Sequence, residues 1–194
     1  MNTFRLRPHP TTPCAFIDAL EVAIERQADG IVLCRYKVRG TIGRLAIPAT
    51  SAAPARTHGL WQHTCFEMFL DSPGASDYSE FNFSPSGDWA AYRFRAYRDG
   101  MADLALDRPP RISCEQTAQC FVLNARVDVA ATAAHRIALS AVLKDRDGGT
   151  CYWALNHPAG KPDFHHAAGF APIATLQSAA TTPHDADDAA PRKR

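Results

Sequence analysis

Several parts of the chain alternate between apolar and polar residues with the period of two that is typical of a β-strand. Along residues 121–129 (FVLNARVDV) the odd positions are all apolar, whereas Asn124, Arg126 and Asp128 are polar. This alternation predicts a strand with one face toward a core and the other toward water. Residues 137–143 repeat the pattern with apolar side chains at their odd positions.

Further segments are short, rich in aromatic and β-branched residues, and separated by turn signals such as Asp99-Gly100 and Gly148-Gly149. They are IVLCRYKV, RLAIP, CFEMFL, YSEFNFS, WAAYRFRAY and CYWAL. Residues 17–28 (IDALEVAIERQA) fit a helix or a strand equally well, because short apolar runs cannot be separated by periodicity alone. So many strands without intervening helical patterns predict an all-β fold, an antiparallel β-sandwich, rather than a βαβ fold.

Length and composition are those of one globular domain. The chain has 194 residues, of which 46% are hydrophobic and 21% charged, as in ordinary globular proteins. We expect the β-sandwich to occupy residues 1–177. Residues 178–194 (SAATTPHDADDAAPRKR) contain no aromatic or large aliphatic residue, so a disordered tail is expected there.

The charge balance and the cysteines narrow the possible partners and the compartment. A formal net charge of +1 leaves no excess for a nucleic-acid groove or an anionic membrane surface. No apolar run approaches the roughly 20 residues of a membrane-spanning helix, and the N-terminal residues have no export signal. The six cysteines form no C-x-x-C pair, so we expect reduced thiols, mostly in the core, and a cytoplasmic location.

Short loops join three segments between Trp61 and Tyr97, so these segments are expected to pair in chain order. Alternation then assigns their side chains to two faces. One face is apolar and is expected to meet the core: Phe66, Met68, Leu70, Phe81, Phe83, Tyr92 and Phe94. The opposite face carries Glu67, Glu80, Asn82, Arg93 and Arg95, bounded by Trp61, Trp89 and Tyr97.

This polar face has two interpretations, and the sequence leaves both open. Carboxylates, an amide and guanidinium groups beside aromatic rings suit a sugar, because they hydrogen-bond hydroxyls while a ring stacks on the C–H face. The same residues also suit cross-strand Glu–Arg pairs on a solvated sheet, worth roughly 0.2–1 kcal/mol each. A concave pocket would favour the first interpretation, and a flat row of ion pairs the second.

Two long stretches of sequence carry a family resemblance. The first is GLWQHTCFEMFLDSPGASDYSEFNFSPSGDWAAYRF (59–94), followed by YRDGM (97–101), and the second is YWALNHPAGKPDFHHAAGF (152–170). Both resemble bacterial DOMON-like proteins, which are related to family-9 carbohydrate-binding modules, and the shared element is FEMFLD, a tyrosine and FNFSPSG. The resemblance covers most of the chain before the tail.

The resemblance implies an antiparallel β-sandwich of the jelly-roll type. Relatives bind sugars or, in some DOMON cytochromes, haem. In sugar-binding relatives two tryptophans hold the ligand, and here Trp61, Trp89 and Trp153 are the only candidates. Haem-binding relatives use a Met and a His, but Met68 falls on the core face and Met101 follows a turn, so no cofactor is expected.

A histidine-rich segment, NHPAGKPDFHH, offers candidate metal ligands. His157, Asp163 and His165 lie within ten residues of one another, and His63 could complete a tetrahedral zinc site. The two prolines make this segment a loop, and no helical H-x-x-x-H spacing occurs. The alternative is that Asp163 and a histidine cap backbone groups and fix the loop to the sheet.

No catalytic motif of nucleophile-elbow, P-loop or dinucleotide-binding type occurs in the sequence. Glu67 and Glu80 could act in glycoside hydrolysis, but Arg93 and Arg95 on the same face would keep both ionised, which does not suit a general acid. We therefore expect a non-catalytic protein that binds a carbohydrate or a similar polar small molecule. The alternatives are a metal-dependent enzyme using the His/Asp loop and an interaction module without a small ligand.

Overall fold

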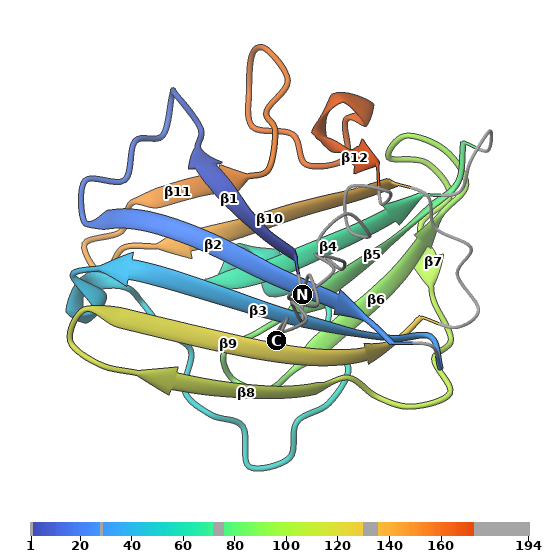
Figure 1. Ribbon diagram of the computed structural model, residues 1–194, viewed down its shortest axis with the longest axis horizontal. Helices are drawn as coiled ribbons and strands as arrows, with labels where there is room; N and C mark the ends of the chain where they lie inside the picture. The colour runs from blue at the N-terminus through green and yellow to red at the C-terminus, as the bar shows by residue number, and fades with distance from the viewer. Residues whose placement is uncertain (1, 28, 72–75, 130–135, 173–194) are drawn as a thin grey trace, which may run out of the picture.

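The computed structural model describes residues 2–27, 29–71, 76–129 and 136–172. These residues form one antiparallel sheet of twelve strands, and the described chain contains no α-helix (Figure 1). No helix in this part of the chain is long and apolar enough to cross a membrane. The all-β antiparallel prediction is confirmed, whereas the predicted tail at 178–194 lies outside the described residues.

The strands are β1 (Asn2–Pro8), β2 (Ile17–Arg26), β3 (Ile31–Gly40), β4 (Cys65–Asp71), β5 (Tyr78–Phe83), β6 (Trp89–Phe94), β7 (Ala102–Asp103), β8 (Arg111–Gln116), β9 (Cys120–Asp128), β10 (Arg136–Lys144), β11 (Thr150–Ala154) and β12 (Ala171–Pro172). Short 3-10 helices occur at Ile42–Arg44, Leu60–Gln62 and Ala167–Gly169. The ambiguous segment 17–28 is thus mainly strand, and RLAIP is not a strand.

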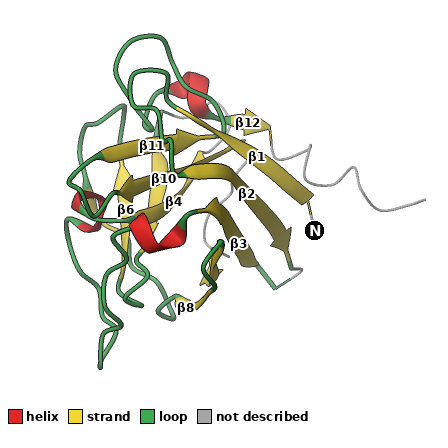
Figure 2. Cartoon of the chain, turned by 90° about the vertical axis from the view of Figure 1, so that its left-hand side faces the viewer, coloured by secondary structure: helices red, strands yellow, loops and turns green. Residues whose placement is uncertain are grey.

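One strand joins the two halves of the sheet. The strand order is β7-β6-β5-β4-β10-β11-β1-β2-β3-β9-β8, with β12 beside β10. The first part of β1 pairs with β2, whereas its last residues, Arg7 and Pro8, pair with β11. Because β1 belongs to both halves, the sheet is continuous and curls into a half-barrel (Figure 2). The structure therefore differs from the predicted sandwich of two separate sheets.

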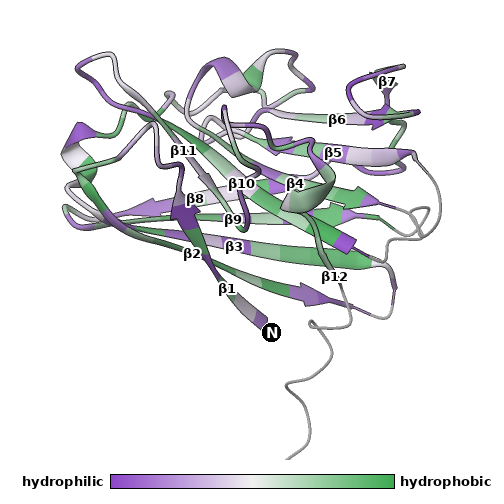
Figure 3. Ribbon diagram, turned by 90° about the horizontal axis from the view of Figure 1, so that it is seen from above, coloured by the Kyte–Doolittle hydropathy of each residue, from purple (hydrophilic) through white to green (hydrophobic). Residues whose placement is uncertain are grey.

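The main core lies inside the curl, between the two halves. The Phe66 ring on β4 lies 5.1 Å from the Tyr36 ring on β3 and 5.8 Å from the Phe121 ring on β9. Sγ of Cys34 lies 3.6 Å from Sδ of Met68. Each fully buried side chain of this size contributes roughly 1.5–3 kcal/mol of transfer free energy. Green, apolar stretches lie along several strands, whereas many loop segments are purple (Figure 3).

Alternation assigned β4 and β5 correctly but β6 incorrectly. Phe66, Met68, Phe81 and Phe83 face the main core as predicted. The turn at 84–88 sets Trp89 opposite Phe83, so Trp89 and Ala91 share the core face, while Tyr92 and Phe94 face the other way. Strand β6 is apolar on both faces, so its hydrophobic pattern does not determine which face is buried.

The face that was expected to be wet carries a second apolar cluster. Its buried members are Leu60, Cys65, Phe69, Tyr78, Ala90, Tyr92, Phe94 and Ala138. Phe164 and Phe170, from the segment after β11, pack against this cluster. The polar residues of β4 and β5 therefore lie between a sheet and a covering loop instead of on an open surface.

The cysteines agree largely with the sequence-based expectation. All six are free thiols. Cys14, Cys34, Cys65 and Cys151 are buried, Cys120 is half-buried and Cys114 is exposed.

Candidate functional site

A pocket of about 680 Å³ lies on the face of the sheet opposite the main core. Side chains from β4, β5, β6, β10 and β11 line it: Glu67, Glu80, Phe94, Val142 and Tyr152. The remaining lining comes from loops: Trp61, Arg98, Met101, Lys161, Pro162, Phe164 and His165. The pocket thus combines charged groups with aromatic walls, as small-molecule sites in proteins commonly do.

Two glutamates from neighbouring strands line the pocket. Glu67 and Glu80 are only 3% and 4% exposed. Oε2 of Glu67 accepts a hydrogen bond of 2.9 Å from the Ser140 hydroxyl, and Oε1 of Glu80 accepts one of 2.8 Å from the Asn82 amide. The alternation pattern predicted Glu67, Glu80 and Asn82 on this face. The register between β4 and β5 places Glu67 directly beside Asn82.

Burial changes the protonation of this carboxyl pair. Burial, followed by the charge of Glu80, raises the pKa of Glu67 to about 8. Burial likewise raises the pKa of Glu80 to about 7. Desolvation favours the neutral form of a carboxyl group, and two nearby carboxylates repel each other. At neutral pH the pair therefore retains at least part of its protons.

The two arginines that were expected to keep both glutamates ionised lie elsewhere. Because β6 turns its other face to the pocket, Arg93 pairs with Asp77 at 2.8 Å, and its side chain is 61% exposed. Arg95 lies 3.7 Å from Asp99 and is also exposed. The prediction that Arg93 and Arg95 share a face with Glu67 and Glu80 is wrong, and so is the conclusion that they keep both glutamates ionised.

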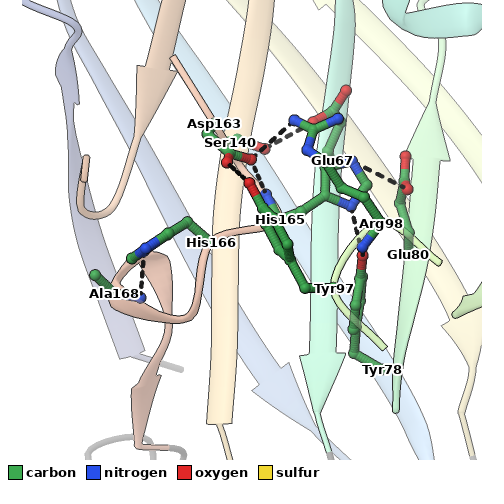
Figure 4. A network of polar contacts seen from close by, with 10 residues as sticks. All are labelled: Glu67, Tyr78, Glu80, Tyr97, Arg98, Ser140, Asp163, His165, His166 and Ala168. Atoms are coloured by element: carbon green, nitrogen blue, oxygen red, sulfur yellow. Dashed lines mark hydrogen bonds and ion pairs between the residues drawn. The ribbon is translucent and has the colours of Figure 1, made fainter. Parts of the chain in front are cut away.

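Arg98 is the guanidinium that lines the pocket instead (Figure 4). Its Nη2 donates a hydrogen bond of 2.8 Å to Asp163. Its backbone has a positive φ of 52°, a left-handed conformation that is uncommon outside glycine. The Asp99-Gly100 turn was a visible signal of a bend here, but nothing in the sequence connected Arg98 to the pocket.

A hydrogen-bonded chain orients His165 over the carboxyl pair (Figure 4). The backbone N–H of Arg98 donates to the Tyr78 hydroxyl at 3.2 Å, and this hydroxyl lies 2.8 Å from Nδ1 of His165. We assign the hydroxyl hydrogen to the bond with Nδ1, which leaves the proton on Nε2. Nε2 lies 3.9 Å from Oε2 of Glu80. Burial, followed by the charge of Arg98, lowers the pKa of His165 to about 4, so its ring is neutral at pH 7.

Asp163 fixes the covering loop to the turn after β6. It accepts hydrogen bonds from the Tyr97 hydroxyl, from Arg98 and from the backbone N–H of His165. Burial alone would raise the pKa of Asp163, but the hydrogen bonds from Tyr97 and Arg98 outweigh this effect and lower the pKa. This arrangement agrees with the interpretation that Asp163 caps backbone groups and fixes the loop to the sheet.

The four residues considered as metal ligands take different partners. Nε2 of His157 lies 2.9 Å from the carbonyl oxygen of Arg7, while His165 and Asp163 bind Tyr78 and Arg98. His63 is an exposed residue after the 3-10 helix at Leu60–Gln62. Among the described residues, no three His, Cys, Asp or Glu side chains are grouped to hold a metal ion.

Only one of the three candidate stacking tryptophans reaches the pocket. Trp61 is 40% exposed and its ring lies 6.2 Å from that of Tyr92. Trp89 and Trp153 are buried in the main core, where a sugar has no access, and Arg56 covers the Trp89 ring at 4.4 Å. The prediction that Trp89 and Trp153 stack on a ligand in this pocket is therefore wrong.

A second hollow, of about 740 Å³, lies beside β8 and is lined by residues that include Cys114, Glu115, Phe121 and Arg146. Glu115 is exposed, unlike the buried carboxyl groups of the Glu67 pocket. The Glu67 pocket is therefore the better candidate site, because burial and perturbed protonation mark functional groups more often than exposed charge does.

The comparisons with known proteins bear on the fold. No protein-family model matches the chain, and no curated protein matches it. A crystal structure from Bacteroides uniformis ATCC 8492, described provisionally as a carbohydrate-binding protein, superimposes with a TM-score of 0.63 at 13% identity, over 88% of this chain and 84% of that one. At this identity the likeness concerns the fold alone.

A family-9 carbohydrate-binding module from Caldicellulosiruptor kristjanssonii, solved in complex with glucose, is also similar. It shares 14% identity, with 73% of this chain and 69% of that chain covered, at a TM-score of 0.40. We base no conclusion on a likeness at this TM-score.

Proposed function

We propose that the protein binds a carbohydrate in the pocket above Glu67 and Glu80. The observation that carries this proposal is the combination of buried carboxyl groups and the exposed ring of Trp61 around one pocket. Carboxyl groups hydrogen-bond sugar hydroxyls, and an aromatic ring stacks on the apolar C–H face of a pyranose. The provisional carbohydrate-binding description of the Bacteroides uniformis protein of similar fold supports the same ligand class.

The finer features implied by the sequence are part of this proposal. They are membership of the DOMON-like relatives of family-9 modules, a jelly-roll arrangement of the strands, and a cytoplasmic location without nucleic-acid or membrane partners. Cell fractionation tests the location: recovery of the protein in the periplasmic or membrane fraction would contradict it.

A glycan array, followed by isothermal titration calorimetry of each hit, tests the ligand class. Trp61→Ala should weaken binding of a hit by about tenfold, because it removes the exposed ring. Trp61→Phe keeps a ring and should retain most of the affinity. Unchanged affinity in Trp61→Ala would mean that the sugar binds elsewhere. An array without any hit would favour the alternative of an interaction module that binds no small ligand.

Glycoside hydrolysis is a second candidate, and the raised pKa values of Glu67 and Glu80 favour it. A carboxyl group that stays protonated near neutral pH can protonate a glycosidic oxygen while a second carboxylate assists. Incubation of the protein with its bound oligosaccharide tests this activity. Release of reducing ends that Glu67→Gln and Glu80→Gln both abolish would support it, and an intact oligosaccharide would exclude it.

A further inference from the structure

We propose that the sugar bound in this pocket carries a free amine, held as an ammonium ion between Glu67 and Glu80. This inference rests on the proposed function and names the ligand class of the same site. It follows from the hydrogen bonds that the two carboxyl groups lack and from the charges that surround them.

Each carboxyl group uses one oxygen within the protein and leaves the other available. Oε2 of Glu67 is bound by Ser140, and Oε1 of Glu80 is bound by Asn82. In the part of the chain that the structure describes, Oε1 of Glu67 and Oε2 of Glu80 accept no hydrogen bond. Both side chains are more than nine-tenths buried and line the pocket. A ligand in the pocket can therefore donate hydrogen bonds to these two oxygens.

The surrounding charges do not neutralise this pair. The titratable and charged groups around it are Arg98, Lys161, Asp163, His165, Tyr36, Cys65, Tyr78 and Tyr92. The Arg98 guanidinium is paired with Asp163 at 2.8 Å, and the His165 ring is neutral at pH 7. Lys161 is an exposed residue of the covering loop. Two buried carboxyl groups therefore face one guanidinium that already has its own partner.

An ammonium group fits these acceptors better than a hydroxyl group does. It has three N–H donors and a positive charge, whereas a hydroxyl has one donor and no charge. Hydrogen bonds between charged groups are about twice as strong as neutral ones. An ammonium ion would favour the ionised form of both glutamates, so a proton leaves the pair as the ligand binds.

The walls of the pocket favour a sugar as the carrier of this amine. The exposed Trp61 ring, with Tyr152 and Phe164, presents apolar surface beside the carboxyl groups. A pyranose that carries an amine offers an apolar C–H face and a cation within one ring, so it can contact both.

Calorimetric titrations at pH 7 with glucosamine, galactosamine and mannosamine, each beside glucose, galactose or mannose, test the proposal. We expect at least one amino sugar to bind ten times more tightly than its neutral counterpart. Equal affinities would overturn the amine assignment and leave carbohydrate binding intact. Absence of binding to all six sugars and to the glycan array would overturn both proposals.

Glutamine variants test which groups hold the amine. Glu67→Gln and Glu80→Gln keep the shape and the hydrogen bond from Ser140 or Asn82, but the new side chain cannot ionise. Each should lower amino-sugar affinity about tenfold and lower neutral-sugar affinity less, so that the preference for the amino sugar shrinks. Glu115→Gln, which removes an exposed carboxylate on β8, is the matched control. A preference for the amino sugar that persists in both pocket variants would overturn the assignment.

A measurement on the unaltered protein keeps the proposal independent of folding defects in the variants. Because the glutamates must lose protons to pair with an ammonium ion, amino-sugar affinity should rise between pH 6 and pH 7.5. Neutral-sugar affinity should stay level or fall over the same range. An amino-sugar affinity that falls as the pH rises from 6 to 7.5 would contradict the proposed pairing.

Discussion

The Tyr78 hydroxyl lies 2.8 Å from Nδ1 of His165, so a residue of β5 anchors the loop that covers the pocket. The same hydroxyl accepts the backbone N–H of Arg98, in the turn after β6. One phenol thus joins three segments: the strand, the turn and the loop. The chain brings them together although Tyr78 and His165 are separated by 87 positions in the sequence.

Replacing Tyr78 by phenylalanine should loosen this junction without altering the core. The Tyr78→Phe change leaves Nδ1 of His165 and the N–H of Arg98 without a partner, which costs about 1–3 kcal/mol of unfolding free energy. Urea denaturation measures this loss. Tyr152→Phe is the control, because no hydrogen bond of the Tyr152 hydroxyl is present in the described chain. Equal stabilities of both variants would show that the junction contributes nothing.

The raised pKa values of Glu67 and Glu80 predict how stability changes with pH. Their values in the fold, about 8 and about 7, exceed the ordinary 4.5, so the folded state binds more protons than the unfolded state between these limits. The free energy of unfolding should therefore fall as the pH rises through 7 and 8. The expected loss between pH 6.5 and pH 8.5 is on the order of 1 kcal/mol or more.

Glu67→Gln tests this pH dependence directly, since glutamine resembles the protonated side chain at every pH. Urea denaturation across pH 6.5–8.5 should give a flatter profile for the variant than for the unaltered protein, and a more stable protein at pH 8.5. The measurement starts at pH 6.5 because the pKa of His165 is lowered to about 4. Below pH 6.5 this histidine makes stability rise with pH, which would mask the effect of the glutamates. A profile as steep as that of the unaltered protein would contradict the raised pKa of Glu67.

Alternation was sufficient for β4, where Glu67 marks the face opposite the main core, and insufficient for β6, where both faces carry aromatic residues. Glu67 follows Phe66 and precedes Met68, both in the main core, so its position opposite the core was predictable from three adjacent residues. Strand β6 has Trp89 and Ala91 on one face and Tyr92 and Phe94 on the other. Its orientation depends on the register with β5, which hydrophobicity alone does not determine.

The sequence also failed to predict the loop residues of the site, and the reason is different. Arg98 and His165 reach the pocket through contacts with Tyr78 that span 20 and 87 positions. Such contacts depend on how the loops fold over the sheet, and loops carry no periodic signal. The sequence indicated only that Asp163 and a histidine might cap local backbone groups, which the bond from His165 N–H to Asp163 bears out.

The two environments of tryptophan predict losses of stability of very different size on alanine substitution. Trp153→Ala removes a ring that is 3% exposed and should cost about 3–5 kcal/mol of unfolding free energy. Trp61→Ala removes a ring that is 40% exposed and should cost less than about 1 kcal/mol. Thermal or urea denaturation of both variants checks the contrast. A larger loss for Trp61→Ala would mean that its ring belongs to the structural core.

Asp163 predicts a separate effect on the covering loop, because it bonds Tyr97, Arg98 and the backbone of His165. Asp163→Asn removes its charge and should speed amide hydrogen exchange in residues 156–166, while global stability falls by at most about 1 kcal/mol. Asp77→Asn, which breaks the exposed pair with Arg93, is the matched control and should leave exchange in the loop unchanged. Because the loop supplies Phe164 and His165 to the pocket, sugar affinity should also fall several-fold in Asp163→Asn. Unaltered exchange and affinity would show that the loop is held by its apolar contacts, Phe164 and Phe170, instead of by this carboxylate.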